Sequence, residues 1–323
     1  MPHTQPELFD PSLTHPLPRG ACGGSRGRRR RGSAAPRRNE LLEVVRLALV
    51  VARRRLNDYS CPKSRHTYTQ PQLLACLVLR AYKKLTYRGT AELLEASDGL
   101  RDALGLRGVP AHTTLKEFCD RVVTPALLDG LVGEVLALLR ERGLVVEELA
   151  VDSTGMEPTC ASAHFVSRSK RTRRGYVKLS LAVACTSVVL VSLALSTGPN
   201  NDLCEAAEVM WRAAGRCAPD WAFKDSGYDA EWVHRFWAAA GATSHVPPVP
   251  RAKEKETGEP TVKGGPGRVR CWSRTPYHYG LRWHAESFIS GMKRTCGSTL
   301  AARSEPALLA EAGLKALAYA IRR

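Results

Sequence analysis

A run of 18 uncharged residues, "LSLAVACTSVVLVSLALS" (179–196), limits what this chain can fold into more than any other segment. A run of this length could cross a membrane as a short helix. However, larger apolar residues alternate with small ones in its first half, and β-branched residues follow. Two buried strands joined by a tight turn at Thr186-Ser187 fit this pattern better. We therefore expect a core hairpin in a globular protein that does not span a membrane.

The charge of the chain indicates its class of partner. Its 323 residues include 48 Lys and Arg against 31 Asp and Glu, a formal net charge of +17. Such a basic chain favours a polyanionic partner, with nucleic acid ahead of an anionic membrane. The ten cysteines include no C-x-x-C pair, so neither a zinc finger nor a redox dithiol is indicated. We expect reduced thiols and a cytoplasmic, nucleoid-associated protein.

The pattern along the chain divides it into three parts. Residues 1–38 contain "RGRRRRGSAAPRR" and are rich in Pro and Gly, which predicts a disordered basic tail. Residues 39–147 predict a helical DNA-binding domain, with helix starts at Asn39, near Thr86, at Thr113 or Thr114, and at Pro125. Residues 148–323 alternate strands and helices. The predicted fold class is therefore α/β, a mixed sheet flanked by helices and preceded by a helical domain.

Two aspartates follow apolar runs and are candidates for one site. Asp152 ends the run in "LAVDST", and Asp225 ends the run in "WAFKD". Carboxylates at the ends of neighbouring core strands can converge, and carboxylate oxygen is the hard ligand that Mg²⁺ prefers. Asp225 is preferred over nearby Asp220 and Asp229 because it follows its apolar run directly.

Other polar residues near these positions are assigned simpler roles. Glu147 and Glu148 are rivals for the position of Asp152. Asp202, in "GPNND", is interpreted as a loop and capping residue. Ser153 and Thr154 could be taken for nucleophiles, but no His–Asp pairing in the sequence supports that role.

The segment "PYHYGLRWHAESFISGMKR" (276–294) predicts a helix with a polar face. On an ideal helix, four of its side chains fall within about 60° of one another, beside a separate apolar stripe. These four are Tyr279, Arg282, Glu286 and Lys293. The pattern alone also fits an ordinary amphipathic helix with a charged edge.

Taken together, Asp152 in "AVDST", Asp225 in "KDSGYD" and the Tyr-Arg-Glu-Lys pattern resemble the DDE transposases of bacterial insertion sequences. The resemblance covers about residues 147–323, and "YTQPQLLACLVLRAYKKLTYRGTAELL" is similar to the helical N-terminal domain of these enzymes. It implies an RNase H-like catalytic domain in which Asp152, Asp225 and Glu286 bind two Mg²⁺ ions, with Mn²⁺ as a substitute. It also implies that Tyr279, Arg282 and Lys293 bind phosphates.

The resemblance implies a reaction and its partners. Water would free a 3′-hydroxyl at each terminal repeat of the element, and that hydroxyl would attack target DNA, with no covalent protein–DNA intermediate. A homodimer on paired ends is expected, with double-stranded DNA as its partner. Two alternatives stay open: a catalytically inactive DNA-binding repressor derived from a transposase, and a nuclease that never joins strands.

A basic segment, "RSKRTRRGYVK" (168–178), lies between the first two predicted strands and carries six cations and no acid. We interpret it as a loop that follows DNA phosphates. The residues expected to make these contacts are Arg171, Arg173, Arg174 and Lys178. A solvated turn is the alternative interpretation.

Overall fold

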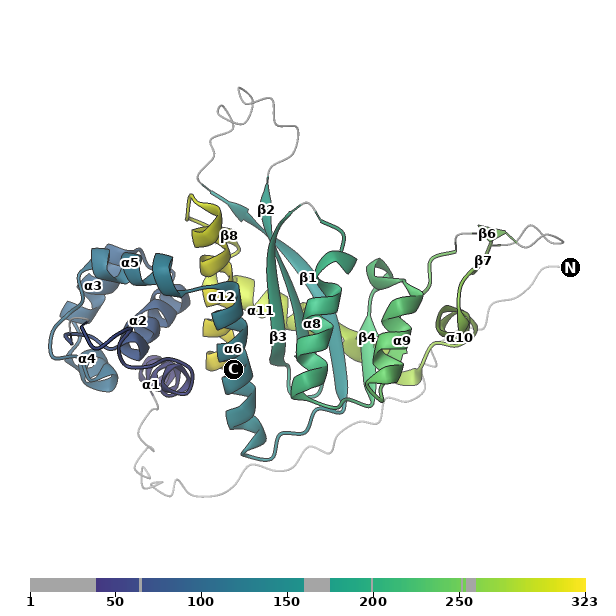
Figure 1. Cartoon of the computed structure of the whole chain (residues 1–323), viewed down its shortest axis with the longest axis horizontal. Coiled ribbons are helices and arrows are strands. Elements are labelled where there is room, and N and C mark those ends of the chain that lie inside the picture. The colour runs from purple at the N-terminus through teal and green to yellow at the C-terminus, as the bar shows by residue number, and fades with distance from the viewer. Residues whose placement is uncertain (1–38, 64–65, 160–174, 199, 251, 254–259) are drawn as a thin grey trace, which may run out of the picture. The chain divides into compact units, whose positions relative to one another are not determined.

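The structure is a computed structural model that describes residues 39–63, 66–159, 175–198, 200–250, 252–253 and 260–323. Residues Asn39–Arg323 form one compact unit by their contacts (Figure 1). The predicted basic tail, residues 1–38, and the predicted phosphate contacts Arg171, Arg173 and Arg174 lie outside the described residues.

The first part of this unit is helical, as predicted. Its helices are α1 (Glu40–Arg53), α2 (Gln70–Lys83), α3 (Tyr87–Glu95), α4 (Asp98–Leu104), α5 (His112–Val122) and α6 (Pro125–Arg140). Polar side chains accept hydrogen bonds from first-turn amides at most of the starts, including the predicted ones at Asn39 and Thr86. The predicted cap at Thr113 or Thr114 is wrong. Helix α5 begins earlier, directly after extended Ala111, so both hydroxyls fall inside its first turn.

A mixed sheet follows the helices. Its main strands are β1 (Glu148–Pro158), β2 (Tyr176–Ala184), β3 (Val189–Gly198), β4 (Trp221–Lys224) and β5 (Thr243–His245), in the order β3-β2-β1-β4-β5. Strands β1, β2 and β3 are antiparallel neighbours, whereas β1, β4 and β5 run parallel. The uncharged run 179–196 forms β2 and β3, so the predicted core hairpin is confirmed. Strand β8 (Thr299–Leu300) extends the far end of β1, and β6 (Ala252–Lys253) pairs separately with β7 (Pro260–Thr261).

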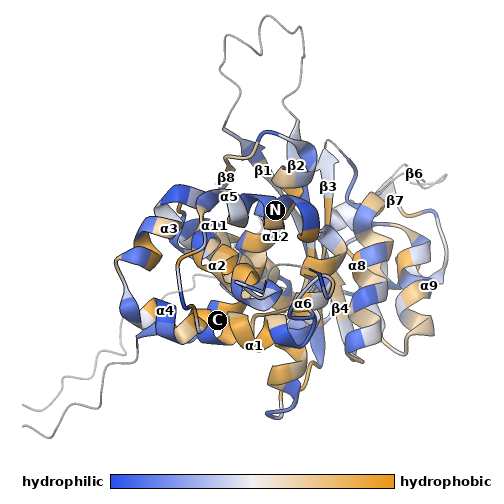
Figure 2. Ribbon diagram, turned by 60° about the vertical axis from the view of Figure 1, so that its left-hand side comes forward, coloured by the Kyte–Doolittle hydropathy of each residue, from blue (hydrophilic) through white to orange (hydrophobic). Residues whose placement is uncertain are grey.

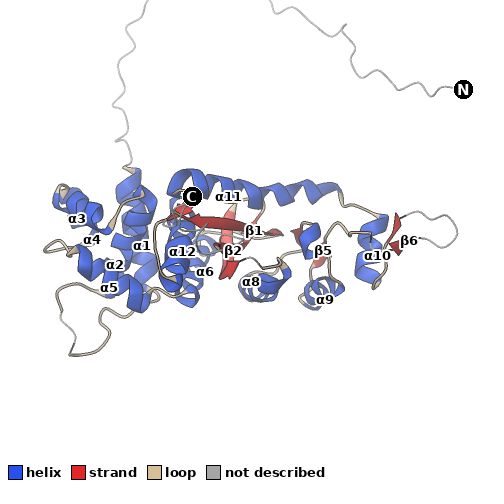
Figure 3. Ribbon diagram, turned by 90° about the horizontal axis from the view of Figure 1, so that it is seen from above, coloured by secondary structure: helices blue, strands red, loops and turns tan. Residues whose placement is uncertain are grey.

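Helices cover both faces of the sheet. Alternate residues of β2 face opposite sides, with Leu179 and Leu181 in one hydrophobic cluster and Ala182 and Ala184 in another. Helices α8 (Leu203–Arg216) and α9 (Glu231–Ala239) cover the second cluster, whereas α11 (Trp283–Cys296) and α12 (Glu305–Arg322) cover the first (Figure 3). Hydrophobic and hydrophilic residues alternate along α8 and α9, as amphipathic helices require (Figure 2). The predicted α/β fold, a mixed sheet flanked by helices after a helical region, is confirmed.

Helix α12 lies at the centre of the larger cluster. Its residues from Ala310 to Ile321 are all buried. It packs against α1, α2, α5, α6 and α11 and against strands β2 and β3. The N-terminal helices and the sheet therefore share one hydrophobic core through α12.

Within the described ranges, no single helix is long and apolar enough to cross a membrane. Helices α5 and α6 pass the same test of length and composition only as a pair, bent by 94° at their junction.

Two local predictions differ from the structure near the candidate site. Asp152 was expected to end a strand, but β1 continues to Pro158, so Asp152 lies within it. The single helix expected from Pro276 is divided into a 3-10 segment, η2 (Tyr277–Arg282), and α11. Tyr279 therefore does not follow the 3.6-residue period on which the predicted common face depended.

A buried carboxylate joins three elements of the core. Asp129, on α6, accepts a hydrogen bond from the backbone N–H of Leu193 on β3, at 2.9 Å. It also accepts bonds from both terminal nitrogens of Arg216 on α8 and pairs with Arg212. Because Asp129 is only 3% exposed, these hydrogen bonds and ion pairs replace the solvation that its carboxylate loses on burial.

We expect Asp129→Ala to lower the free energy of unfolding by about 3 kcal/mol, because it removes the carboxylate shared by two partly buried guanidinium groups and leaves the amide of Leu193 without its acceptor. Equilibrium denaturation would measure this loss. Asp102→Ala, at an exposed position on α4, is the matched control and should change stability by less than about 0.5 kcal/mol. Equal effects of the two substitutions would contradict the assigned role of Asp129.

Candidate active site

The pairing of two strands brings the two candidate aspartates together. Strands β1 and β4 are parallel, with Val151 opposite Lys224. The next residue on each side is a candidate acid, Asp152 or Asp225, and both are half-buried. Asp225 follows the last residue of β4 and accepts a hydrogen bond from the backbone N–H of Gly227 at 3.0 Å, at the start of η1 (Ser226–Tyr228). This register places the two acids next to each other, as the sequence predicted.

The third candidate acid reaches the same place from α11. Asp152, Glu286 and Lys293 line one open hollow of about 500 Å³. Glu286 is 54% exposed at its side chain and forms an ion pair with Arg282, with 2.6 Å between Oε1 and Nη2. One cation of the predicted set is thus bound to the acid of the same set.

Burial and mutual repulsion raise the pKa values of Asp152 and Asp225. Burial raises the pKa of Asp152 to about 6, and the charges of Asp225 and Glu286 act in the same direction, against the backbone N–H of Ser153 and the charge of Arg282. The pKa of Asp225 is also raised, first by burial and then by the charge of Asp202. The carboxylates are therefore close enough to affect one another.

Lys293 and Tyr279 form hydrogen bonds to β1 and β4, the strands next to the site. The ammonium of Lys293 donates hydrogen bonds to Oγ1 of Thr154 at 2.6 Å and to the carbonyl of Gly155 at 3.0 Å, which ties α11 to β1. Burial lowers the pKa of Lys293. The hydroxyl of Tyr279 donates to the carbonyl of Lys224 at 3.1 Å, immediately before Asp225. Both side chains thus contact the strands that present the aspartates.

Asp202 is a fourth acid of the site that the sequence analysis did not identify. It precedes α8 but makes no side-chain capping bond, contrary to the expected capping role. It accepts a hydrogen bond from the hydroxyl of Ser153, the neighbour of Asp152. A methyl group on Gly227 would lie 2.5 Å from Oδ2 of Asp202 and 3.1 Å from Oδ1 of Asp225, so both carboxylates approach the same point. Only the folding of the sheet brings Asp202 here, and no local pattern in "GPNND" indicates it.

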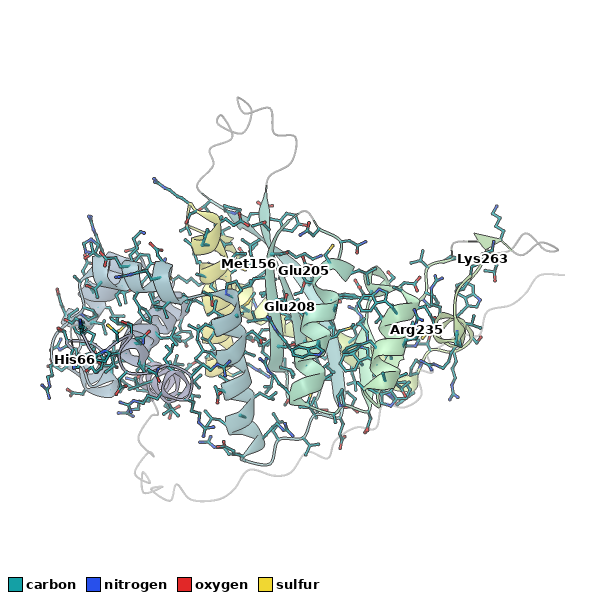
Figure 4. All side chains as sticks on the ribbon, viewed as in Figure 1. His66, Met156, Glu205, Glu208, Arg235 and Lys263 are labelled. Atoms are coloured by element: carbon teal, nitrogen blue, oxygen red, sulfur yellow. The ribbon has the colours of Figure 1, made fainter. Side chains whose placement is uncertain are left out.

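The predicted phosphate contact at Lys178 is corrected by the structure. Lys178 is 3% exposed and faces α8 from β2. Its ammonium lies 2.9 Å from Oδ1 of Asp202 and 3.4 Å from Oε2 of Glu205, and it donates to the carbonyl of Asn200. Glu205 is labelled on α8 in Figure 4. Because its donors are used inside the protein, Lys178 acts as an internal counter-ion.

A buried hydroxyl lies close to the same acids. Tyr228, on η1, is fully buried, and its hydroxyl lies near the hydroxyl of Ser153. Burial and the charges of Asp202, Asp152 and Asp225 raise its pKa. The rival acid Asp229, one residue later, is instead held in a buried two-point ion pair with Arg268. This pairing favours Asp225 over Asp229 for a role in the site.

The donor chemistry of the site fits a divalent metal ion. Asp152 and Asp225 offer hard oxygen ligands at adjoining positions, and burial, aided by neighbouring acids, raises the pKa of both. The hydroxyl of Tyr228 lies close to them. Among the described residues, no three His, Cys, Asp or Glu side chains are grouped closely enough to hold a metal as they stand. Glu286 is directed to Arg282, so it would have to leave this ion pair to complete the site.

Comparison with known proteins identifies a family for this chain. Residues 147–321 match the family described as "Transposase DDE domain". The chain belongs to this family. A solved structure of the piggyBac transposase synaptic complex with hairpin DNA is similar at 10% identity and a TM-score of 0.39, covering 87% of this chain and 71% of that chain. No curated protein matches the sequence.

The pKa of Asp152 in this DDE domain predicts a pH-dependent stability. Because the folded-state pKa, about 6, exceeds the ordinary value of 3.8, protonation favours the folded state, and this contribution is lost as pH rises through 6. In chelator-treated protein, we expect Asp152→Asn to raise the free energy of unfolding by about 2 kcal/mol above pH 7. The gain should shrink toward pH 4. Equilibrium denaturation between pH 4 and 8 measures this gain, and Asp220→Asn, at an exposed position, is the control. If Asp152→Asn were no more stable than wild type above pH 7, burial of the ionised carboxylate would not be the cause of the raised pKa.

The close approach of Asp202 and Asp225 leaves no room for a side chain at position 227. We expect Gly227→Ala to destabilise the protein by about 1–3 kcal/mol, because its methyl group would displace a carboxylate. Gly215→Ala on α8 is the matched control, with no atom within 4 Å of the added methyl group, and it should be neutral or slightly stabilising. Adding Asp202→Ala to Gly227→Ala should recover part of the loss, and no recovery would contradict the proposed clash.

Proposed function

We propose that this protein is an Mg²⁺-dependent transposase of a bacterial insertion sequence, which cleaves the ends of its element and joins them to target DNA. One observation supports the proposal: Asp152, Glu286 and Lys293 line one hollow, and Asp225, which directly follows β4, is close enough for its charge to act on Asp152. The Tyr-Arg-Glu-Lys pattern of η2 and α11 supports the same assignment.

The acids have distinct parts in this proposal. Asp152, central in the sheet, would share two Mg²⁺ ions with Asp225 and Glu286, and Mn²⁺ could replace Mg²⁺. When bound, such ions supply an activated water and stabilise the charge of the leaving oxygen. Asp202 would keep Ser153 and the loop of Gly227 in place around the two aspartates.

The cations would bind the DNA phosphates. Lys293 uses two ammonium donors within the protein and has a third for a phosphate oxygen. The guanidinium of Arg282 is suited to two-point phosphate binding, and its transfer from Glu286 to a phosphate would release that carboxylate into the site. Tyr279 would fix the end of β4 through its hydrogen bond to the carbonyl of Lys224, and the edge of its ring would face the DNA strand.

The proposed partners follow from charge and family. The net charge of +17 suits double-stranded DNA, both terminal repeats and target. The helical region 39–147, with Arg171, Arg173 and Arg174, would supply further DNA contacts. We propose a homodimer on paired ends in the cytoplasm, associated with the nucleoid.

A second candidate function is a DNA-binding repressor without catalysis. The observation that favours it is the ion pair between Glu286 and Arg282, which engages the third acid with a cation. If that pair persists on DNA, the protein would bind terminal repeats without cleaving them.

The proposal is tested by incubating a duplex that carries the element's terminal repeats with purified protein and Mg²⁺. We expect strand cleavage and joining with wild type, and a loss of at least about 10³-fold for Asp152→Ala, Asp225→Ala or Glu286→Ala, because each removes a metal ligand. Asp220→Ala, at an exposed acid just before β4, is the control and should retain activity. Binding without cleavage by wild type would select the repressor, and cleavage by all three variants would refute the proposed site.

A further inference from the structure

A second hollow of about 610 Å³ lies beside the acidic site, and we call it the basic pocket. It is lined by residues of α2, α3 and α5 and by residues between Cys296 and Lys315. The segment after Lys293 separates the two hollows, because Arg294 and Ser298 line the acidic one, whereas Cys296, Gly297 and Thr299 line the basic pocket. The two hollows are therefore neighbours on opposite sides of the end of α11.

The basic pocket carries unbalanced positive charge. Five basic side chains line it, against two acids: Arg80, Lys84, Lys116, Arg303 and Lys315 against Asp120 and Glu311. Both acids are engaged within the protein. Asp120 pairs with Lys116, and Glu311 accepts bonds from the backbone N–H groups of Ala301 and Ala302 and pairs with Lys315 at 3.5 Å. The charges of Arg80, Lys84 and Arg303 thus remain for an anion.

These three cations form no ion pair with the acids of the pocket among the described residues. The guanidinium of Arg80 lies 4.0 Å from the centre of the Tyr87 ring, and its buried Nε has no hydrogen-bond partner among the described residues. Lys84 donates to the carbonyl of Arg294 at 2.9 Å, which uses one of its three ammonium donors. Arg303 is exposed at the rim.

The rest of the lining suits a base and a sugar. Its apolar members include an aromatic ring and small side chains: Ala81, Leu85, Tyr87, Ala301, Ala302 and Ala307. An aromatic ring among cations is the arrangement by which proteins bind single-stranded nucleic acid, with bases stacked on the ring and phosphates on the charges. Because Arg80 covers one face of Tyr87, a base would stack on the other face of the ring or on the guanidinium itself.

We propose that the basic pocket binds a single-stranded stretch of DNA that continues from the strand in the acidic site. The inference rests on the proposed function and adds to it a binding site for the strand beyond the reacting phosphate. Lys84 would link the two, since it lines the pocket and holds the end of the helix that carries Lys293.

The test compares binding of a fluorescent oligothymidine of about eight nucleotides to full-length wild type, Arg303→Glu and a control, by anisotropy at several salt concentrations. Arg235→Glu is the control, because Arg235 is exposed on α9, which packs against β5 and α10 and does not line the pocket (Figure 4). We expect Arg303→Glu to weaken binding at least about fivefold and to reduce the salt slope by about one unit. The control should change affinity less than twofold, and equal weakening by both variants would overturn the proposal.

A positional measurement and a free nucleotide complete the test. An oligonucleotide containing bromodeoxyuridine should crosslink under ultraviolet light to the peptide that holds Tyr87, and the crosslink should disappear in Tyr87→Leu. Crosslinks confined to other peptides would overturn the proposal. So would free thymidine monophosphate that binds as tightly as the oligonucleotide, because the pocket would then be a mononucleotide site.

The test separates this inference from the proposed function. Asp152→Asn should lose cleavage and keep its oligonucleotide affinity within about twofold, since Asp152 does not line the pocket. Binding at the pocket by a wild type that never cleaves would refute only the proposed function. Cleavage by Arg303→Glu with unchanged oligonucleotide affinity would refute only the pocket.

Discussion

The parallel pairing of β1 with β4 is the interaction on which the active site depends. Leu149, Ala150 and Val151 lie opposite Ala222, Phe223 and Lys224, and all six residues are buried. If one strand slipped by one residue, each of its side chains would move to the opposite face of the sheet. Hydrophobic packing therefore fixes the register. The same register sets Asp152 beside Asp225. The core of the sheet thus determines the spacing of two acids that have no direct bond to each other.

The site collects more negative charge than an isolated group of side chains would tolerate, and cations placed around it offset part of that charge. Lys178 pairs with Asp202 from within the sheet, Arg282 pairs with Glu286 at the surface, and Lys293 lies along the hollow. Among the described residues, Asp152 and Asp225 form no ion pair, although the charge of Arg282 acts on both, and burial raises the pKa of each. Two half-buried acids with raised pKa values thus lie where a metal ion is proposed to bind, which is the pattern expected of a functional site.

The sequence predicted those parts of the site that local pattern determines. The uncharged run specified the β2–β3 hairpin, polar caps located α1 and α3, and acids after apolar runs indicated Asp152 and Asp225. Residues that meet only through tertiary structure were missed or misassigned. Asp202 resembled a loop residue because its partners, Ser153 and Lys178, lie on β1 and β2, far from it in the sequence. Lys178 resembled a surface cation because its carboxylate partners follow it by more than 20 residues. The 3-10 segment before α11 was missed because its sequence also suits the first turns of an α-helix.

The burial of α12 has a consequence for synthesis on the ribosome. Helices α1, α2 and α6 rest their apolar faces on α12, although more than 160 residues separate α6 from it. A growing chain exposes those faces until residues beyond 304 leave the exit tunnel, which favours protection by chaperones during translation. Premature termination before α12 would leave the N-terminal helices without their packing partner, so incomplete products should be degraded and should not compete for DNA.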